Sequence, residues 1–513
     1  MKKIKNIVIL SLLAVVLATS SCSDFLNINK DPNRVTGDNI TPNLIFTQAE
    51  NAVGRRAALR FVFLNNWMGY WSRSGTFIVE QEETTYKATN TFSETNWDDA
   101  YNIQFDLNQV KTRALAANDS VLAGAAMVLS VKLWQETVDQ FGSIPYSQTF
   151  DYVKYPQPAY DKASDIYADL LVQLDKSIVY LNAAAPKSTF ATTDIIFARG
   201  GSVSTAVTMW KKFANTIKLR IFLHQADKAG GGFTPSAAQL TKIATDGGFL
   251  TAGQNVSVQP GYTNSTAKQN PFYGAYGLTP AGAAATTNNK PNNYFYKTIL
   301  GSGATDPRST KFYLGTVAGT DYGALGGNAA NSNNTIVGSE IYPGTATQDQ
   351  FILPAYESLF FQAEAITRSW LTGGDAAAQT MFESAIKESF TYLNATTTAN
   401  PTPAAAATAY IAAVSTAQWA NSGTSVTTKV QFIGFQKYIA NCGTDPLESW
   451  TDYRRGALIL LPGYLSYNPN RTSTKLPNVM PYPQSEWSVN SANIASPGRN
   501  TTTIFTEKLF WQP

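Results

Sequence analysis

The 513-residue sequence predicts a mainly α-helical protein built from hairpins of paired helices, with a long insert of loops and short strands. In the stretch 97–228, apolar residues recur at steps of three and four, the period of one helix face, and a second helical stretch follows at 353–441. Between them, residues 230–350 lose this period and are rich in Gly, Asn, Thr, Ala and Tyr. The sequence therefore predicts a helical scaffold that displays one irregular insert.

The first 21 residues have the layout of the signal peptide of an exported lipoprotein. Three lysines come first, an apolar run from Ile7 to Leu17 follows, and small residues then lead to Cys22. The run is too short to span a bilayer. A cysteine at the cleavage point predicts that its thiol carries a lipid and that the mature chain, 22–513, begins there. An ordinary signal peptide with an incidental cysteine is the alternative interpretation.

The mature chain has a charge close to zero. The full sequence has 39 basic and 36 acidic residues, and loss of the three lysines in the signal peptide leaves 36 of each sign. This balance does not support a basic surface for nucleic acid. Because only 15% of the residues are charged, we expect a polar surface that suits neutral, hydroxyl-rich ligands. If Cys22 carries lipid, Cys442 has no partner, and the fold depends on its apolar core without a disulfide.

Two amphipathic helices are predicted within the first helical stretch. In 119–141 the apolar residues form one stripe, and Gly142 supplies a left-handed C-terminal cap. In 161–181 a second stripe follows a stretch broken by prolines, and Asp161 can cap that helix. Adjacent helices of this length are typical of tetratricopeptide-like hairpins.

Aromatic side chains suggest where a ligand binds. Disordered segments are poor in aromatic residues, so the insert, which is rich in them, is predicted to be packed. Two clusters stand in polar sequence without a helical period: Tyr70, Trp71 and Tyr86 in the first, and Tyr273, Tyr276 and Tyr294 in the second. An exposed ring can stack on the apolar face of a sugar while neighbouring amides and guanidinium groups bind its hydroxyls. We expect Trp71 and at least one tyrosine of the insert to line a shallow platform, although the core is the alternative place for each ring.

No constellation for catalysis or metal binding is predicted. His224 is the only histidine and lies on a predicted helix, so neither a Ser-His triad nor a site with several histidines is favoured. Walker, nucleophile-elbow, CxxC and EF-hand motifs are absent from the sequence. The acidic pairs 82–83 and 98–99 are sequence neighbours, which rarely lie across a cleft as the two carboxyls of a glycosidase must. We therefore expect no catalytic residue, metal or cofactor.

The order of motifs along the chain resembles the SusD/RagB family of nutrient-binding outer-membrane lipoproteins of Bacteroidetes, and in particular its second SusD-like branch. The matching segments are CSDFLNINKDPNRV (22–35), VDQFGSIPYSQTF (138–150), YPQPAYDKASDIYADLLVQLDKSI (155–178), WKKFANTIKLR (210–220), DPR (306–308), LPAYESLFFQAEA (353–365), FIGFQKYIANCGTDPLESWTDYRRG (432–456), MPYPQSEWSVNSANI (480–494) and LFW (509–511). Together they extend over essentially the whole mature chain.

The resemblance implies a single SusD-like domain built on tetratricopeptide-like repeats. It also implies a protein held by lipid on the outer membrane, facing the exterior, that acts as a lid over a TonB-dependent, SusC-like transporter and captures a nutrient, usually an oligosaccharide. Trp210, Arg220, Glu364 and Trp450 lie in the matching motifs and are interpreted as scaffold residues that hold helices together.

Our interpretation is a non-catalytic surface lipoprotein that binds a nutrient glycan and delivers it to that transporter. A peptide-binding member of the same family, a cell-surface glycoside hydrolase and a structural adhesin are the alternatives. The extended, Pro- and Asn-rich segment 31–46 lies close to the predicted anchor, so we expect it to form part of the surface that contacts the transporter.

Overall fold

The computed structural model describes residues 40–73, 81–182, 187, 189–286, 288–303, 305–313, 319–324 and 345–513. The signal peptide, Cys22 and residues 31–39 lie outside this part of the chain. The predictions of a lipid anchor and of a contact segment beside it therefore stay predictions.

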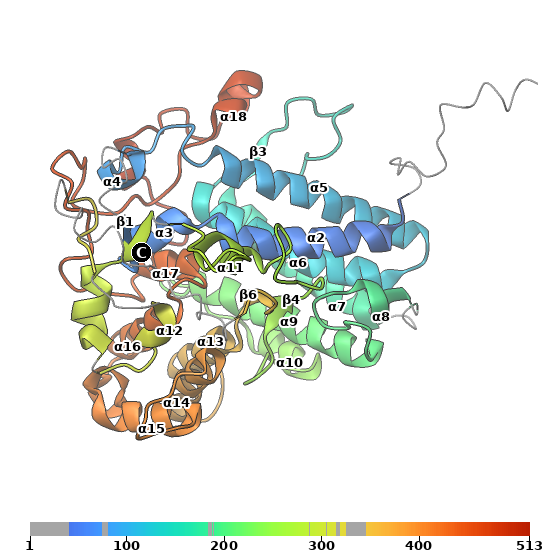
Figure 1. Ribbon diagram of the computed structural model, residues 1–513. Helices are drawn as coiled ribbons and strands as arrows, with labels where there is room; N and C mark the ends of the chain where they lie inside the picture. The colour runs from blue at the N-terminus through green and yellow to red at the C-terminus, as the bar shows by residue number, and fades with distance from the viewer. Residues whose placement is uncertain are drawn as a thin grey trace, which may run out of the picture.

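The first half of the chain folds into paired helices, as the sequence predicts. The helices are α2 (Pro42–Leu59), α3 (Val62–Trp67), α4 (Glu82–Thr85), α5 (Glu94–Ala116), α6 (Ser120–Phe141), α7 (Ala163–Asn182), α8 (Thr189–Thr193), α9 (Val203–His224) and α10 (Ala237–Thr245). α2 packs on α5, α5 on α6, α6 on α7, and α7 on α9 (Figure 1). The mainly α fold class built from helical hairpins is confirmed.

The ends of the two predicted amphipathic helices agree only in part with the sequence analysis. α6 begins after Asp119, whose side chain accepts a hydrogen bond from the backbone N–H of Leu122, and it ends at Gly142 with φ 76°. α7 begins at Ala163, so the prediction that Asp161 caps it is wrong. Asp161 lies in strand β3 (Tyr160–Asp161), and its carboxylate accepts the backbone N–H groups of residues 146 and 147 at 3.1 and 2.8 Å. It thereby fixes the turn before the helix instead of the first turn of the helix.

The second half contributes a further group of helices. They are α13 (Ala355–Thr367), α14 (Gly374–Leu393), α15 (Pro403–Ala413), α16 (Val426–Ala440), α17 (Pro446–Arg454) and α18 (Gln484–Val489). α13 packs against α14 and α16, and also against α9 of the first half. The two helical stretches are therefore joined through one continuous core, which contains buried apolar residues from Ile45 to Trp511.

Short antiparallel strand pairs organise the insert. β4 (Val256–Val258) pairs with β6 (Gln350–Leu353), which brings the two ends of the insert together. β5 (Asn289–Pro291), in the middle of the insert, pairs with β1 (Trp71–Arg73), and β2 (Ile144–Pro145) pairs with β3. Between the strands lie helices α11 (Pro271–Tyr276) and α12 (Ser309–Phe312) and the π-helical turn Tyr294–Ile299. The insert is thus packed on the helical scaffold, as its aromatic content predicts.

The interior combines a central apolar helix with buried charges. Among the described residues, only α6 is long and apolar enough to cross a membrane, and its apolar window is 94% buried inside the protein, as core helices are. Around it, Arg220 donates to Gln135 at 3.0 Å, and His224 lies 3.1 Å from the carboxylate of Glu448. The four residues interpreted as scaffold, Trp210, Arg220, Glu364 and Trp450, are all buried, which confirms that interpretation.

Candidate functional site

The two aromatic clusters singled out in the sequence come together through the pairing of β1 with β5. Trp71 lies opposite Pro291 in this ladder. Its ring centroid lies 5.2 Å from that of Tyr276 and 6.0 Å from that of Phe272, and the latter two rings are 5.1 Å apart. A segment near the N-terminus and the insert, about 200 residues apart in sequence, therefore build one aromatic cluster on the scaffold.

The expected exposure of these rings is wrong for four of the six residues. Tyr70, Trp71 and Tyr86 have no exposed surface and Tyr294 is also buried. The Tyr70 hydroxyl donates to the backbone oxygen of residue 438 at 2.6 Å, and the Tyr86 hydroxyl accepts the backbone N–H of residue 466 at 2.8 Å. These rings pack against other aromatic side chains: Tyr70 contacts Tyr438, Tyr86 contacts Trp67, and Tyr294 contacts Tyr464.

Tyr273 and Tyr276 are half-buried and are the members of the set that reach the surface. Contact of any of the six residues with a ligand stays a prediction, and for the four buried rings it requires a movement of the side chains that cover them. The indole N–H of Trp71 is buried, and no hydrogen-bond acceptor faces it within the described part of the chain. An unused buried donor next to the half-buried Tyr276 is a group that an oxygen-rich ligand could satisfy.

The charges next to this cluster are neutralised by partners. Arg73, in β1, forms an ion pair with Glu83 and donates to Asn289 at 2.6 Å. Burial raises the pKa of Tyr276 to about 12, against the opposing effect of Arg73 and Arg60. The Tyr276 hydroxyl is therefore neutral at physiological pH and can both donate and accept a hydrogen bond. In the described part of the chain the surroundings offer ring faces and neutral polar groups, and Arg73 is already engaged by Glu83 and Asn289.

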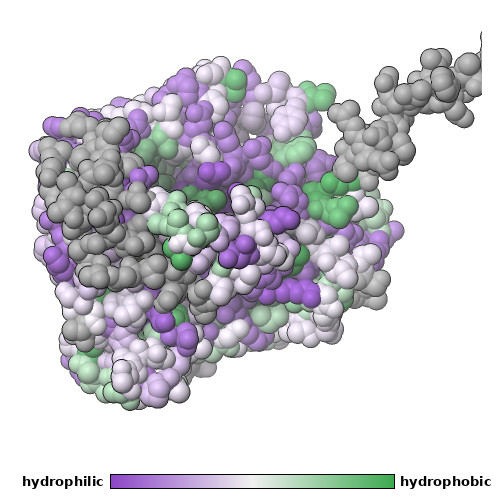
Figure 2. Space-filling model, viewed as in Figure 1, coloured by the Kyte–Doolittle hydropathy of each residue, from purple (hydrophilic) through white to green (hydrophobic). Residues whose placement is uncertain are grey.

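A polar groove lies beside this cluster, between α2 and α5. It has a volume of about 290 Å³ and is lined by Arg55 and Arg60 of α2 and by Asp99, Asn102 and Asp106 of α5. Arg60 forms an ion pair with Asp99. Hydrophilic residues gather in the upper middle of the molecule, where α2 and α5 run (Figure 2). α11, which carries Tyr276, packs against α2, one wall of this groove.

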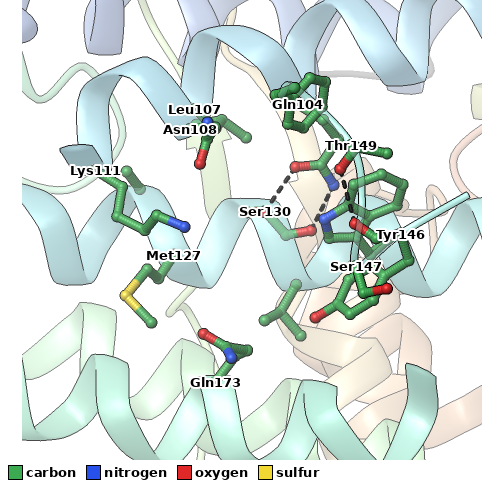
Figure 3. Close-up of a pocket in the computed structure, with 14 residues that line it drawn as sticks. Gln104, Leu107, Asn108, Lys111, Met127, Ser130, Tyr146, Ser147, Thr149 and Gln173 are labelled. Carbon is green, nitrogen blue, oxygen red and sulfur yellow. Dashed lines mark hydrogen bonds between the residues drawn. The ribbon is translucent and has the colours of Figure 1, made fainter. Parts of the chain in front are cut away.

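A second polar pocket, of about 240 Å³, lies between α5, α6 and α7 (Figure 3). Gln104 and Ser130 form mutual hydrogen bonds in it, at 2.8 and 2.6 Å, and Lys111 and Gln173 extend toward the same space. Burial lowers the pKa of Lys111. The sequence analysis missed this pocket because each of these residues, taken alone, is an ordinary polar position of a helix.

The structure shows how the histidine and some of the acidic residues noted in the sequence are held. No group of three or more His, Cys, Asp or Glu side chains suited to a metal ion occurs in this part of the chain. His224 is buried between the carboxylates of Asp139 and Glu448, at 3.3 and 3.1 Å, and is closed to a substrate. Of the two acidic pairs noted in the sequence, Glu83 and Asp99 are held in ion pairs with Arg73 and Arg60.

Comparison with known proteins gives one consistent result. A SusD-like family described as starch-binding and associating with the outer membrane matches residues 32–483. Among solved structures, the chain is similar to a SusD/RagB family protein from Bacteroides thetaiotaomicron, with 18% identity, a TM-score of 0.71, and coverage of 92% of this chain and 99% of that one. No curated protein matches the sequence.

Two further solved structures have the same fold. The chain is similar to a chitin-binding SusD homolog from Flavobacterium johnsoniae, with 20% identity, a TM-score of 0.69, and coverage of 91% of this chain and 98% of that one. It is similar to a SusD homolog from Bacteroides fragilis, with 18% identity, a TM-score of 0.68, and coverage of 92% and 99%. At these identities the likeness shows a shared fold.

Proposed function

The chain belongs to the SusD-like family, and on this premise we propose that it captures a neutral nutrient oligosaccharide at the outer membrane and passes it to a TonB-dependent transporter. The observation that carries the proposal is the aromatic cluster built by β1 and the insert. There Trp71, with its unused indole N–H, lies against the half-buried ring of Tyr276. The description of the family as starch-binding and the chitin-binding homolog support a sugar as the ligand.

The ligand site is tested with maltoheptaose and N-acetylchitohexaose as probes. Truncating Tyr276 to alanine removes one ring of the cluster, and loss of one aromatic anchor weakens binding by about tenfold or more. Tyr180→Ala is the matched control, because Tyr180 is also a half-buried tyrosine but lies on α7. Affinities measured by calorimetry should fall for Tyr276→Ala alone. The double variant Tyr273→Ala, Tyr276→Ala gives the contrary outcome. If it binds the oligosaccharides as tightly as the wild type does, the ligand site is not at this cluster.

The absence of catalysis is tested on the same samples. We expect bound oligosaccharide to be recovered intact, with no new reducing ends. Released reducing ends would assign the protein to the glycoside hydrolases. If the protein binds peptides and none of the neutral glycans on an array, its function is peptide capture.

The proposed anchor is tested at Cys22. Cys442 is buried as a free thiol, so it forms no disulfide with another described residue. We expect Cys22→Ser to release a folded protein from the membrane fraction, because the diacylglycerol predicted on Cys22 is the proposed anchor. Cys442→Ser is the control and should stay membrane-bound. Retention of Cys22→Ser in a strain without the transporter would contradict the lipid anchor.

The proposed partner is tested by purification in mild detergent. We expect a TonB-dependent barrel to be recovered in near-stoichiometric amount, through an interface above about 2,000 Å² if the complex is stable. Deleting residues 31–39 should weaken this recovery while leaving oligosaccharide affinity unchanged. Recovery of the chain alone, under conditions that preserve other outer-membrane complexes, would leave a free surface binder without the lid function.

A further inference from the structure

A third hollow lies along α5, next to the groove described above, and Asn102 lines both. It has a volume of about 470 Å³, which is within the range of small-molecule sites, and it is enclosed by α5, the segment 145–158 and α18. Figure 1 shows α18 and the loop that precedes β3 above α5. None of the residues predicted as ligand residues lines this cavity.

Hydrogen bonds between the three walls form the cavity in advance of any ligand. The Gln148 side chain accepts the backbone N–H of Ala159 at 2.9 Å, which closes the loop on itself. The Gln157 side chain donates to the backbone oxygen of Val489 at 2.9 Å, and Asn490 donates to the backbone oxygen of residue 158 at 3.0 Å. The loop is therefore tied to α18, and a ligand would meet a rigid surface.

Aromatic rings remain open to solvent in this cavity. Tyr152 is 66% exposed and Phe105 is 36% exposed. Between them lies Phe150, whose ring centroid is 5.8 Å from that of Phe105 and which also lines the polar pocket of Figure 3. Exposed rings in a preformed cavity are available for stacking on the apolar face of a sugar.

The backbone at Phe150 is strained. Its φ is +68°, in the left-handed region, where a bulky side chain is an outlier. Such strain persists where the surrounding structure requires it, and it concentrates at binding sites. Here it holds the Phe150 ring as a wall between the two hollows.

The polar groups of the cavity fit hydroxyl groups and disfavour anions. The side chains of Asp98, Asn102 and Tyr152 make no hydrogen bond within the described part of the chain. The Glu486 carboxylate is oriented by the Tyr160 hydroxyl at 2.9 Å and by an amide at 3.0 Å. Among the described residues no lysine or arginine lines the cavity, and the nearby Lys154 lies over the ring of Tyr155. The cavity therefore offers carboxylates and amides without a compensating cation.

We propose that this cavity is a second carbohydrate site, separate from the Trp71–Tyr276 cluster, that binds an uncharged pyranose. The sugar stacks on the rings of Tyr152 and Phe105, and its hydroxyls donate to Asp98 and Glu486. A negatively charged sugar is rejected because both carboxylates repel it.

The test compares variants of the two sites on the full chain. The neutral probes are maltose and N,N′-diacetylchitobiose, used at high millimolar concentration. The charged probes are a disaccharide of uronic acid, similar in size to chitobiose, and pentalysine. We expect Tyr152→Ala to weaken binding of at least one neutral probe by about tenfold in the Tyr276→Ala background, where only the second site operates. The melting temperature should not change, because most of the Tyr152 side chain is in water. Val153→Ala is the control, since Val153 is the adjacent exposed residue and does not line the cavity.

Crystals soaked in the same neutral probes give a second measurement, with sugar density expected against Tyr152 and Phe105. The proposal is overturned if neither neutral probe binds the Tyr276→Ala variant, or if the double variant Tyr152→Ala, Tyr276→Ala binds both probes as well as Tyr276→Ala does. Preferential binding of the uronic acid or of pentalysine would also overturn it. A different result would contradict only the site at the Trp71–Tyr276 cluster. In that case Tyr276→Ala would leave binding of the neutral probes unchanged, and Tyr152→Ala would abolish it.

Discussion

Replacing Glu364 by glutamine should destabilise the protein by about 3 kcal/mol at neutral pH. Glu364 is 2% exposed on α13, and its two oxygens accept hydrogen bonds from Arg455 at 2.8 and 2.7 Å. Arg368 donates to the same carboxylate at 2.9 Å. Burial alone would raise the pKa of Glu364, but the two arginines outweigh it and lower the pKa from 4.5 to about 2. At about 1.4 kcal/mol for each pKa unit, the ionised form gains about 3 kcal/mol on folding.

The stability difference between wild type and Glu364→Gln should depend on pH, which a loss of packing alone would not cause. Because the pKa of Glu364 is lower in the folded protein, its contribution is complete above the unfolded pKa and is lost as the pH falls toward 2. Denaturation by urea should therefore show a difference of about 3 kcal/mol between wild type and Glu364→Gln at neutral pH, narrowing below about pH 4.5. Glu383→Gln, a half-buried position on α14, is the control and should change little. A difference below about 1 kcal/mol, the value of an exposed pair, or one that does not narrow in acid, would refute this reasoning.

Three further predictions concern other buried or strained positions. Burial lowers the pKa of His224, but Glu448 and Asp139 raise it more. The contribution of His224 to stability is therefore complete below about pH 6.5 and is lost as the pH rises through the folded pKa. The free energy of unfolding should fall more steeply above neutral pH for the wild type than for His224→Gln. Burial and nearby carboxylates raise the pKa of Glu357, whose oxygens have no hydrogen-bond partner in the described residues, so Glu357→Gln should raise the melting temperature in mildly alkaline solution and not in acid. Phe150→Gly should be more stable than Phe150→Ala by about 1 kcal/mol in chemical denaturation, because glycine adopts a positive φ without strain; the usual order, with alanine more stable, would show that this residue is not strained.

The helical scaffold could be predicted from the sequence because its signal is local. The stripes of α6 and α7 repeat at helical steps, and the residues that cap α6 lie next to it, so no knowledge of the rest of the fold is needed. The start of α7 was misplaced because Asp161 has the chemistry of a cap. Its carboxylate is used instead by the backbone of residues 146 and 147, a pairing that depends on the β2–β3 turn.

The candidate sites could be predicted only in part, because exposure is a property of the whole fold. Trp71 and Tyr276 were rightly singled out as aromatic residues in irregular sequence, and the structure brings them together. The sequence carries no sign that Trp71 is covered while Tyr276 reaches the surface. The cavity at Tyr152 has no sequence signal for a related reason, since its rings come from a helix and a loop and its remaining wall from a C-terminal helix more than 300 residues away.

Much of the small complement of charge in this protein lies in its interior. Lys437 lies 2.8 Å from both Glu448 and Asp452, and Arg308 lies 2.7 Å from Asp306, with all five residues buried. Buried ion pairs add little net stability, but removing one partner is costly. Lys437 lies on α16 and its two partners lie on α17, so these pairs hold the two helices together. Buried ion pairs also affect the surface. The mature chain is expected to have 36 charges of each sign, and each charge that is buried leaves one fewer in contact with solvent. The Trp71–Tyr276 cluster offers rings and neutral polar groups, whereas the cavity at Tyr152 adds the carboxylates of Asp98 and Glu486. Because the proposed ligand is uncharged at both sites, its binding depends on stacking and hydrogen bonds, which salt screens less than it screens an attraction between exposed charges.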